Sequence, residues 1–220
     1  MEAPLRELLR WLRATRGPVP ARDRHLAGTP AEHPVIDEVL AELAALGVRP
    51  DVAFVWSIEG SGVEEEVPGV IHLHRTMLIA ERIPKHVIEL SERYSALTFR
   101  ATIRHELGHA LLFAQPKVAR TPAFRRLFGD VRTKYRVGTV VDEVGRRIRR
   151  HGGLRNPRYR RVVSLYAAAH PHEQFAEAVR IALATRGDPQ AIARWATRHD
   201  AGAHAIAQIE FTAGWLASYR

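Results

Sequence analysis

Residues 98–114 read TFRATIRHELGHALLFA, and this stretch has the apolar spacing of a helix with one buried face. An apolar stripe runs from Ile103 to Ala114 at helical intervals. Pro116 lies just beyond the expected end, where a helix that has to stop often has a proline. The spacing therefore predicts a helix over residues 98–114, with one face in the core and the other available for polar side chains.

That polar face carries HELGH at residues 105–109, which is an H-E-x-x-H motif. Residues four apart share one face of a helix, so His105 and His109 can both direct a ring nitrogen to one Zn²⁺. Glu106 then stands beside them, near a water molecule on the ion. The motif predicts a zinc site with two histidine ligands and with Glu106 as catalytic base, although a chain rich in histidine and glutamate needs a further element to support it.

That further element is YAAAHPHEQFAEA at residues 166–178. Its helix is expected to begin at His170-Pro171, because proline is favoured at the first helical position. Glu173 and Glu177 are four apart on this helix, where two like charges repel unless a cation lies nearby. We expect Glu173 to be the third zinc ligand and Glu177 to accept a hydrogen bond from a ligand histidine.

Other third ligands stay open on the sequence alone. His170, His172 and Asp142 are possible, and His172 is the closest rival; the two histidines are otherwise expected to line the rim of the cleft or to cap the helix. The metzincin pattern is excluded, because Leu112 and Gln115 occupy the positions where it requires glycine and histidine.

Three short β-rich runs precede this helix: residues 52–57, 69–74 and 76–81. They predict a small sheet, and the third run, TMLIAE, is expected to be an edge strand on which an extended peptide substrate could add. His72 and His74 alternate along the second run; they are expected to be exposed, with an approach to substrate as the alternative.

The fold class that follows is α+β, mostly helical, with a small mixed or antiparallel sheet next to the active-site helix. Apolar leucines near the N-terminus and a second pattern starting near Pro34 predict two helices before the sheet. Residues 1–50 are expected to form an N-terminal helical segment packed on a catalytic unit of residues 51–220. A cleft is expected between residues 51–114 and 115–220.

Composition narrows the chemistry further. Apolar residues make up 46% and charged residues 26% of the 220 residues, which is typical of a folded protein. Because the chain has no cysteine, thiolate ligands, disulfides and a cysteine nucleophile are all excluded. No signal peptide or transmembrane run is recognisable, so a cytoplasmic location without membrane contact is the default expectation.

The formal net charge is +9, and eight arginines gather between Arg146 and Arg161. Such a segment could attract nucleic acid or an acidic protein partner. The plainer interpretation is a solvated helix and loop, and we regard nucleic-acid binding as the less favoured reading.

An H-E-x-x-H motif completed by a downstream glutamate resembles the gluzincin class of zinc peptidases. Tyr166, seven residues before Glu173, is similarly placed to a tyrosine beside the metal in the anthrax lethal factor peptidase domain. The chain is also similar, over about residues 98–185, to bacterial zinc-binding metallopeptidases that carry an N-terminal zinc ribbon, which this cysteine-free chain lacks. The resemblance implies a zincin-like fold, a peptide or protein substrate, and a hydroxyl of Tyr166 that donates to the oxyanion or the leaving group.

The predicted activity is hydrolysis of peptide bonds by metal-activated water, with Glu106 as general base. The alternative is an inactive or autoinhibited zinc-binding scaffold that engages a protein or nucleic-acid partner through its arginine-rich segment. A peptidase associated with DNA is a third possibility. Glu106 favours the peptidase, because zinc binding does not need this residue and hydrolysis does.

Overall fold

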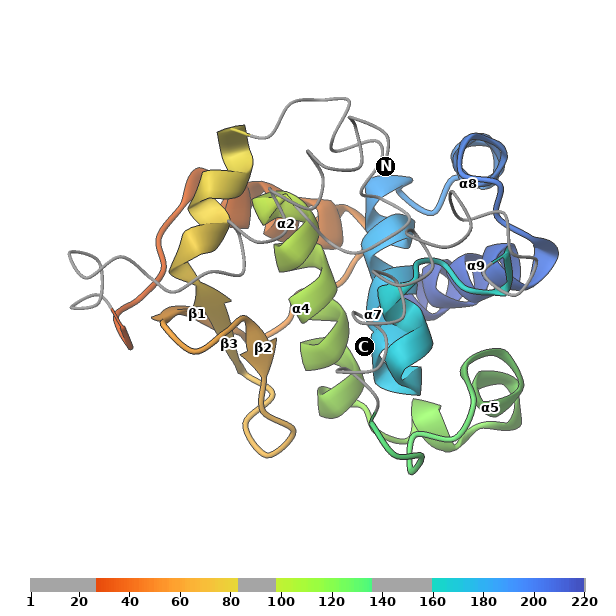
Figure 1. Ribbon diagram of the computed structural model, residues 1–220, viewed down its shortest axis with the longest axis horizontal. Coiled ribbons are helices and arrows are strands. Elements are labelled where there is room, and N and C mark those ends of the chain that lie inside the picture. Colours follow the sequence, from red (N-terminus) through yellow and green to blue (C-terminus); the bar gives the residue numbers. More distant parts are fainter. Residues whose placement is uncertain (1–26, 83–97, 136–159, 220) are drawn as a thin grey trace, which may run out of the picture.

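A central helix separates a small sheet from a group of helices contributed by the second half of the chain (Figure 1). The structure is a computed structural model that describes residues 27–82, 98–135 and 160–219. The central helix, α4 (Phe99–Ala114), contacts strands of the sheet on one side and helix α7 (Pro171–Ala184) on the other. Helix α4 therefore lies where both halves of the described chain can reach it.

Helix α4 begins one residue after the predicted start and ends at the predicted residue. Thr98 caps its first turn, because the Thr98 hydroxyl oxygen accepts a hydrogen bond from the backbone N–H of Ala101 at 3.1 Å. The helix ends at Ala114, before Pro116. Ile103, Leu107 and Ala110 are buried, so the predicted apolar stripe faces the core up to Ala110, whereas Ala114 at its end is exposed.

The sheet is mixed and has three strands among the described residues, in the order β1-β3-β2. Strand β1 pairs parallel with β3, with Ala53 opposite Val70, and β2 pairs antiparallel with β3, with Gly62 opposite His72. The order leaves β2 at the edge that approaches α4. The bounds are β1 (Ala53–Ser57), β2 (Gly62–Val63) and β3 (Val70–His74).

The prediction of a strand over residues 76–81 is wrong, because this run belongs to the 3₁₀ helix η2 (Arg75–Arg82). A short apolar run does not by itself distinguish a strand from a helical turn. The turn places the Thr76 hydroxyl 2.5 Å from Nδ1 of His74, so a side-chain hydrogen bond ties the end of β3 to the start of η2. The third strand is instead the two-residue β2, which is too short to show a period in the sequence.

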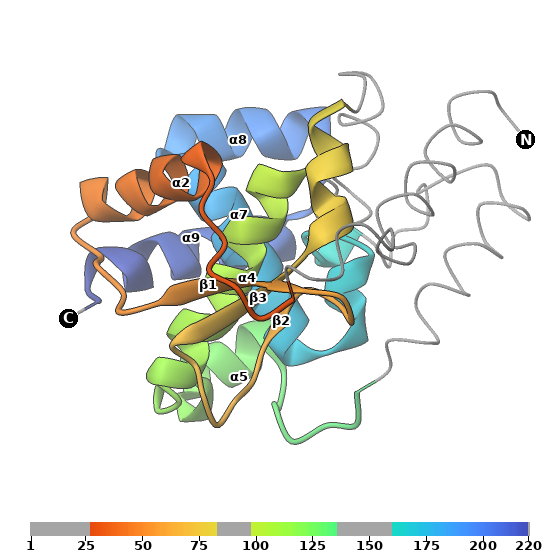
Figure 2. The same cartoon turned by 90° about the vertical axis from the view of Figure 1, so that its left-hand side faces the viewer.

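Helix α7 also begins as predicted, with Pro171 in its first turn and His170 as the N-cap residue. It packs against α4 on one side and α9 on the other, and Figure 2 shows these helices behind the sheet. A cluster of aromatic rings that includes Phe124 and Phe175 joins α5 to α7. The remaining elements are η3 (Val118–Arg120), α5 (Pro122–Phe128), η5 (Tyr166–Ala169), α8 (Pro189–Arg198) and α9 (Ala203–Ala217).

The helix expected from Pro34 is α2 (Pro34–Ala45), and it packs on α4. Arg104 binds both carboxylate oxygens of Glu42, at 2.6 and 2.8 Å, and Arg100 pairs with Glu38. The first expected helix lies outside the described residues. The division at residue 50 stays a prediction. Within the described ranges, no helix combines the length and apolar character needed to cross a membrane.

Candidate metal centre

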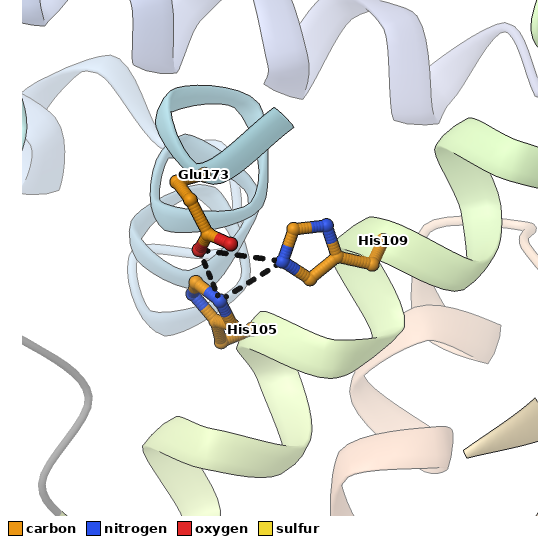
Figure 3. Close-up of side chains that lie close together, drawn as sticks. All are labelled: His105, His109 and Glu173. Carbon is orange, nitrogen blue, oxygen red and sulfur yellow. Dashed lines mark hydrogen bonds and ion pairs between the residues drawn. The ribbon is translucent and has the colours of Figure 1, made fainter. Parts of the chain in front are cut away.

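Three side chains from α4 and α7 direct one atom each to a common point (Figure 3). Nε2 of His105 lies 3.1 Å from Nε2 of His109 and 3.0 Å from Oε2 of Glu173. Nε2 of His109 lies 3.4 Å from the same oxygen of Glu173. The three atoms thus form a nearly equilateral triangle, although Glu173 lies more than sixty positions after the two histidines in the sequence.

The size of this triangle fits zinc. A tetrahedral zinc ion with bonds of about 2.0–2.1 Å to nitrogen and oxygen holds its ligand atoms about 3.3 Å apart. Two imidazoles and one carboxylate are also a donor set of catalytic zinc sites, which keep a fourth position open for water or substrate. The geometry and the donor types therefore agree with a catalytic zinc centre.

Hydrogen bonding around the triangle points to the same conclusion. When His105 is neutral, as a metal ligand must be, Oε2 of Glu173 is buried without a hydrogen-bond donor among the described residues, and Nδ1 of His109 is likewise buried without a partner there. A buried polar atom left unpaired typically costs about 1–3 kcal/mol, and more when it is charged. A cation held by Oε2 of Glu173 would remove much of that penalty.

The side chains buried around the triangle carry more negative than positive charge, and a divalent cation would balance the difference. Among the aspartates, glutamates, lysines and arginines of the described chain, only Glu106, Glu173, Glu177 and Arg180 are buried. With the three carboxylates ionised and both histidines neutral, as metal ligands are, these groups carry an excess of two negative charges. Buried charges are paired or bind metals, because an isolated one is costly to remove from water. An ion of charge +2 neutralises this group.

Glu177 links His105 to Arg180. The carboxylate of Glu177 accepts a hydrogen bond of 2.8 Å from Nδ1–H of His105, and Arg180 donates to it from Nη2 at 2.8 Å and from Nε at 3.1 Å. With its Nδ1 proton engaged in this way, neutral His105 presents the lone pair of Nε2 to the triangle. Glu177 thus lies where the sequence led us to expect it, although its role stays a prediction.

The acidic surroundings favour positive charge on His105. Burial lowers the pKa of His105, but hydrogen bonds and charges of Glu173 and Glu177 outweigh burial and raise this pKa to about 10. Burial raises the pKa of Glu177, while Arg180 and His105 lower it to about 2. The metal-free site therefore holds a proton on His105, and a metal ion would displace that proton when it binds.

Gly108 explains how α4 and α7 come close enough to build the triangle. A Cβ atom at Gly108 would lie 2.7 Å from Cα and 3.2 Å from Cβ of Ala176, which is closer than packed atoms approach. Glycine in the motif and alanine at position 176 therefore allow the two helix backbones to touch. This contact brings Glu173 and Glu177 to the histidines of α4.

A cavity of about 220 Å³ opens onto the triangle. Its wall includes Glu106, whose pKa burial raises. The wall includes residues from both 51–114 and 115–220, the two parts of the chain between which a cleft was expected. The division of the chain into two sublobes stays a prediction. The lining residues are Ser61, Gly62, Val63, His105, Glu106, His109, Phe113, Tyr135, Tyr166, His172 and Glu173.

The remaining candidates from the sequence take different places. Tyr166 lines the cavity, with its ring centre 5.7 Å from that of His105. Nδ1 of His170 accepts a hydrogen bond of 3.2 Å from the backbone N–H of His172, so His170 caps α7, while His172 lines the cavity. Both placements match the expectation of a capping and a rim position. Asp142 lies outside the described residues.

The expectation of exposed histidines in β3 is wrong for His74. This side chain is buried, where Nδ1 contacts the Thr76 hydroxyl and Nε2 lies 3.3 Å from the carbonyl oxygen of Ile58. Burial lowers the pKa of His74. Its ring thus packs the end of β3, and neither His74 nor His72 lines the cavity.

Sequence reasoning missed Tyr135, whose hydroxyl donates a hydrogen bond to Oε1 of Glu173. Burial and then the charge of Glu173 raise the pKa of Tyr135, so the hydroxyl keeps its proton. It also missed Arg180 and Phe113. Arg180 follows Glu177 by three residues, a spacing that permits an ion pair on a helix and could have been noticed. Nothing in the spacing identifies Tyr135.

Comparison with known proteins agrees with the donor set. No curated protein and no solved structure matches the chain. Residues 76–212 match the model of the family described as "Putative zinc-binding metallo-peptidase". The matched range contains His105, His109 and Glu173, the buried group that can hold a metal ion. Because the match covers more than half of its length, the chain belongs to this family of zinc-binding metallopeptidases.

Proposed function

We propose that this chain is a zinc-dependent peptidase of the gluzincin type with a zincin-like fold. His105, His109 and Glu173 hold the ion, and Glu106 is the general base. The observation that carries the proposal is that the three ligand atoms and Glu106 border one cavity, so that an ion, a water molecule and a scissile bond can meet there.

Zinc supplies Lewis acidity, which lowers the pKa of a water molecule that it binds to about 7 and polarises a carbonyl group. The protein supplies proton transfer. Glu106 accepts the proton of the attacking water and passes it to the leaving amine, as a general base and then a general acid. Glu177 keeps His105 in one tautomer throughout, through the 2.8 Å hydrogen bond to Nδ1.

Tyr166 is proposed to stabilise the transition state. Its ring lies at the wall of the cavity beside His105. A phenol in this position can donate a hydrogen bond to the oxyanion or to the leaving group, where charge develops during the reaction.

The substrate is proposed to be an extended peptide that pairs with β2. Strand β2 is the edge strand nearest α4, and Gly62 and Val63 both line the cavity. Addition of a strand to an exposed edge gives main-chain hydrogen bonds without a sequence requirement. This edge replaces residues 76–81, which form η2 and offer no strand.

The substitution Glu106→Gln tests the catalytic assignment. It keeps the size of the side chain but removes the base, so we expect wild-type zinc content and loss of hydrolysis by at least about 100-fold. Metal analysis of both proteins and digestion of a mixed peptide library, with and without a chelator, measure the two quantities. Cleavage retained by zinc-loaded Glu106→Gln would refute the assignment.

The same pair distinguishes a peptidase from a zinc-binding scaffold. A scaffold predicts no chelator-sensitive cleavage in either protein, despite bound zinc. Of the segment Arg146–Arg161, only Arg160 and Arg161 are described, and Arg160 pairs with Asp200 at 2.9 Å. Binding of a protein or nucleic-acid partner by this segment therefore stays a prediction. The cytoplasmic location also stays a prediction.

A further inference from the structure

We propose that Tyr135 is a positioning residue that makes Glu173 a one-oxygen metal ligand. Its hydroxyl holds Oε1, so that only Oε2 is offered to the ion. The inference rests on the proposed function to the extent that Glu173 binds metal, and it does not require that the protein cleave peptides.

The two carboxylate oxygens of Glu173 have different surroundings. Oε1 accepts the hydrogen bond from the Tyr135 hydroxyl. Oε2 lies 3.0 Å from Nε2 of His105, and once that nitrogen has lost its proton to bind an ion, Oε2 has no hydrogen-bond donor among the described residues. One oxygen is therefore occupied by a protein donor, and the other is free to bind an ion.

Tyr135 is held by the residue that begins the helix of Glu173. Its ring packs on that of His170, with centres 4.9 Å apart. Nε2–H of His170 donates to the carbonyl oxygen of Thr133 at 3.0 Å, while Nδ1 accepts the backbone N–H of His172 at 3.2 Å. One neutral tautomer of His170 makes both contacts. The segment that ends in Tyr135 and the first turn of α7 are thereby fixed to each other.

This arrangement has a consequence for the open coordination position. A carboxylate with two free oxygens can bind a metal through both, and the second oxygen then takes space that water or substrate requires. With Oε1 engaged by Tyr135, Glu173 occupies one position only. Tyr135 is 44% exposed and lines the cavity, so it can act on Glu173 without closing the site.

Tyr135→Phe tests the proposal, because it removes the hydroxyl and keeps the ring against His170. We expect zinc affinity to fall by about 10- to 100-fold, the usual effect of losing a partner of a metal ligand. Competition with a chromophoric chelator measures this affinity. Tyr219→Phe removes a hydroxyl at the end of α9, outside the cavity lining, and is the matched control.

Cobalt(II) substitution supplies a readout that a purely structural role would not change. The visible absorption of cobalt weakens when its coordination number rises from four to five. We expect weaker absorption in Tyr135→Phe, whose Glu173 can bind through both oxygens, and the wild-type spectrum in Tyr219→Phe. An unchanged cobalt spectrum, or an unchanged zinc affinity, in Tyr135→Phe overturns the proposal.

These readouts separate this proposal from the proposed function. If the wild-type protein binds cobalt but cleaves no peptide, the peptidase proposal fails, while the two tyrosine variants still decide the role of Tyr135. If the wild-type protein binds neither zinc nor cobalt, both proposals are refuted.

Discussion

The side chains around the triangle present particular atoms to it because neighbours hold the others. Glu177 engages Nδ1 of His105 and leaves Nε2 for an ion. Tyr135 engages Oε1 of Glu173 and leaves Oε2. Metal ligands that are fixed in this way need little rearrangement when the ion binds, which favours affinity.

Alanine substitutions rank the two candidates for the third ligand. Glu173→Ala removes an oxygen at the triangle, and we expect zinc affinity to fall by at least about 100-fold. His172→Ala removes a ring from the cavity wall and should change zinc affinity by less than about tenfold. Zinc titration of the two metal-free variants measures both. The opposite ranking would transfer the third ligand position to His172.

Among the residues of the site, the sequence alone identifies those that are spaced one helical turn apart. His105 and His109 are four apart, as are Glu173 and Glu177, and the structure places all four together. Tyr135 could not be predicted, because it reaches Glu173 from a separate segment and shares no helix with it. Only the packing of the chain establishes that contact.

Helices α4 and α7 determine how far apart the metal-binding atoms lie. Their backbones touch where Gly108 meets Ala176. The histidines belong to one helix and the glutamates to the other, so a change in this separation alters every distance between the two pairs. The site is thus sensitive to one small residue that binds nothing itself.

We expect Gly108→Ala to destabilise the protein and weaken zinc binding. Alanine gains about 1 kcal/mol over glycine in a helix interior, but crowding a packed site typically costs about 1–3 kcal/mol, and here the obstacle is backbone. Denaturant unfolding and zinc titration measure the two effects. Gly214→Ala is the matched control, since a Cβ at this position of α9 meets nothing within 4 Å. It should stabilise by up to about 1 kcal/mol.

A more stable Gly108→Ala with wild-type zinc affinity would contradict this account of the helix contact.

Among the helices and strands, caps and prolines predicted the starts of α4 and α7, because these signals are local. The prediction of a strand at residues 76–81 was wrong. A short apolar run indicates that its residues are buried, but it is too short to show whether they repeat with the period of a strand or of a helix. Strand β2 has only two residues, and its pairing with β3 depends on contacts distant in sequence.

Across the whole molecule, helix α4 lies between a sheet and a group of helices that come from different halves of the chain (Figure 1). The candidate metal site lies where α4 meets α7. The four buried aspartate, glutamate, lysine or arginine side chains of the described residues all gather there. Their excess of two negative charges is a property of the assembled fold. The sequence contains these residues, but only the folded structure shows that the guanidinium of Arg180 pairs with the carboxylate of Glu177. The charges of the other two carboxylates would be balanced by a bound cation.

Anomalous diffraction from crystals of the zinc-loaded protein, recorded on both sides of the zinc absorption edge, tests the central claim most directly. The account predicts one strong peak in the cavity, about 2.0–2.1 Å from Nε2 of His105, Nε2 of His109 and Oε2 of Glu173. A zinc peak held by other residues, with none at this triangle, would contradict it.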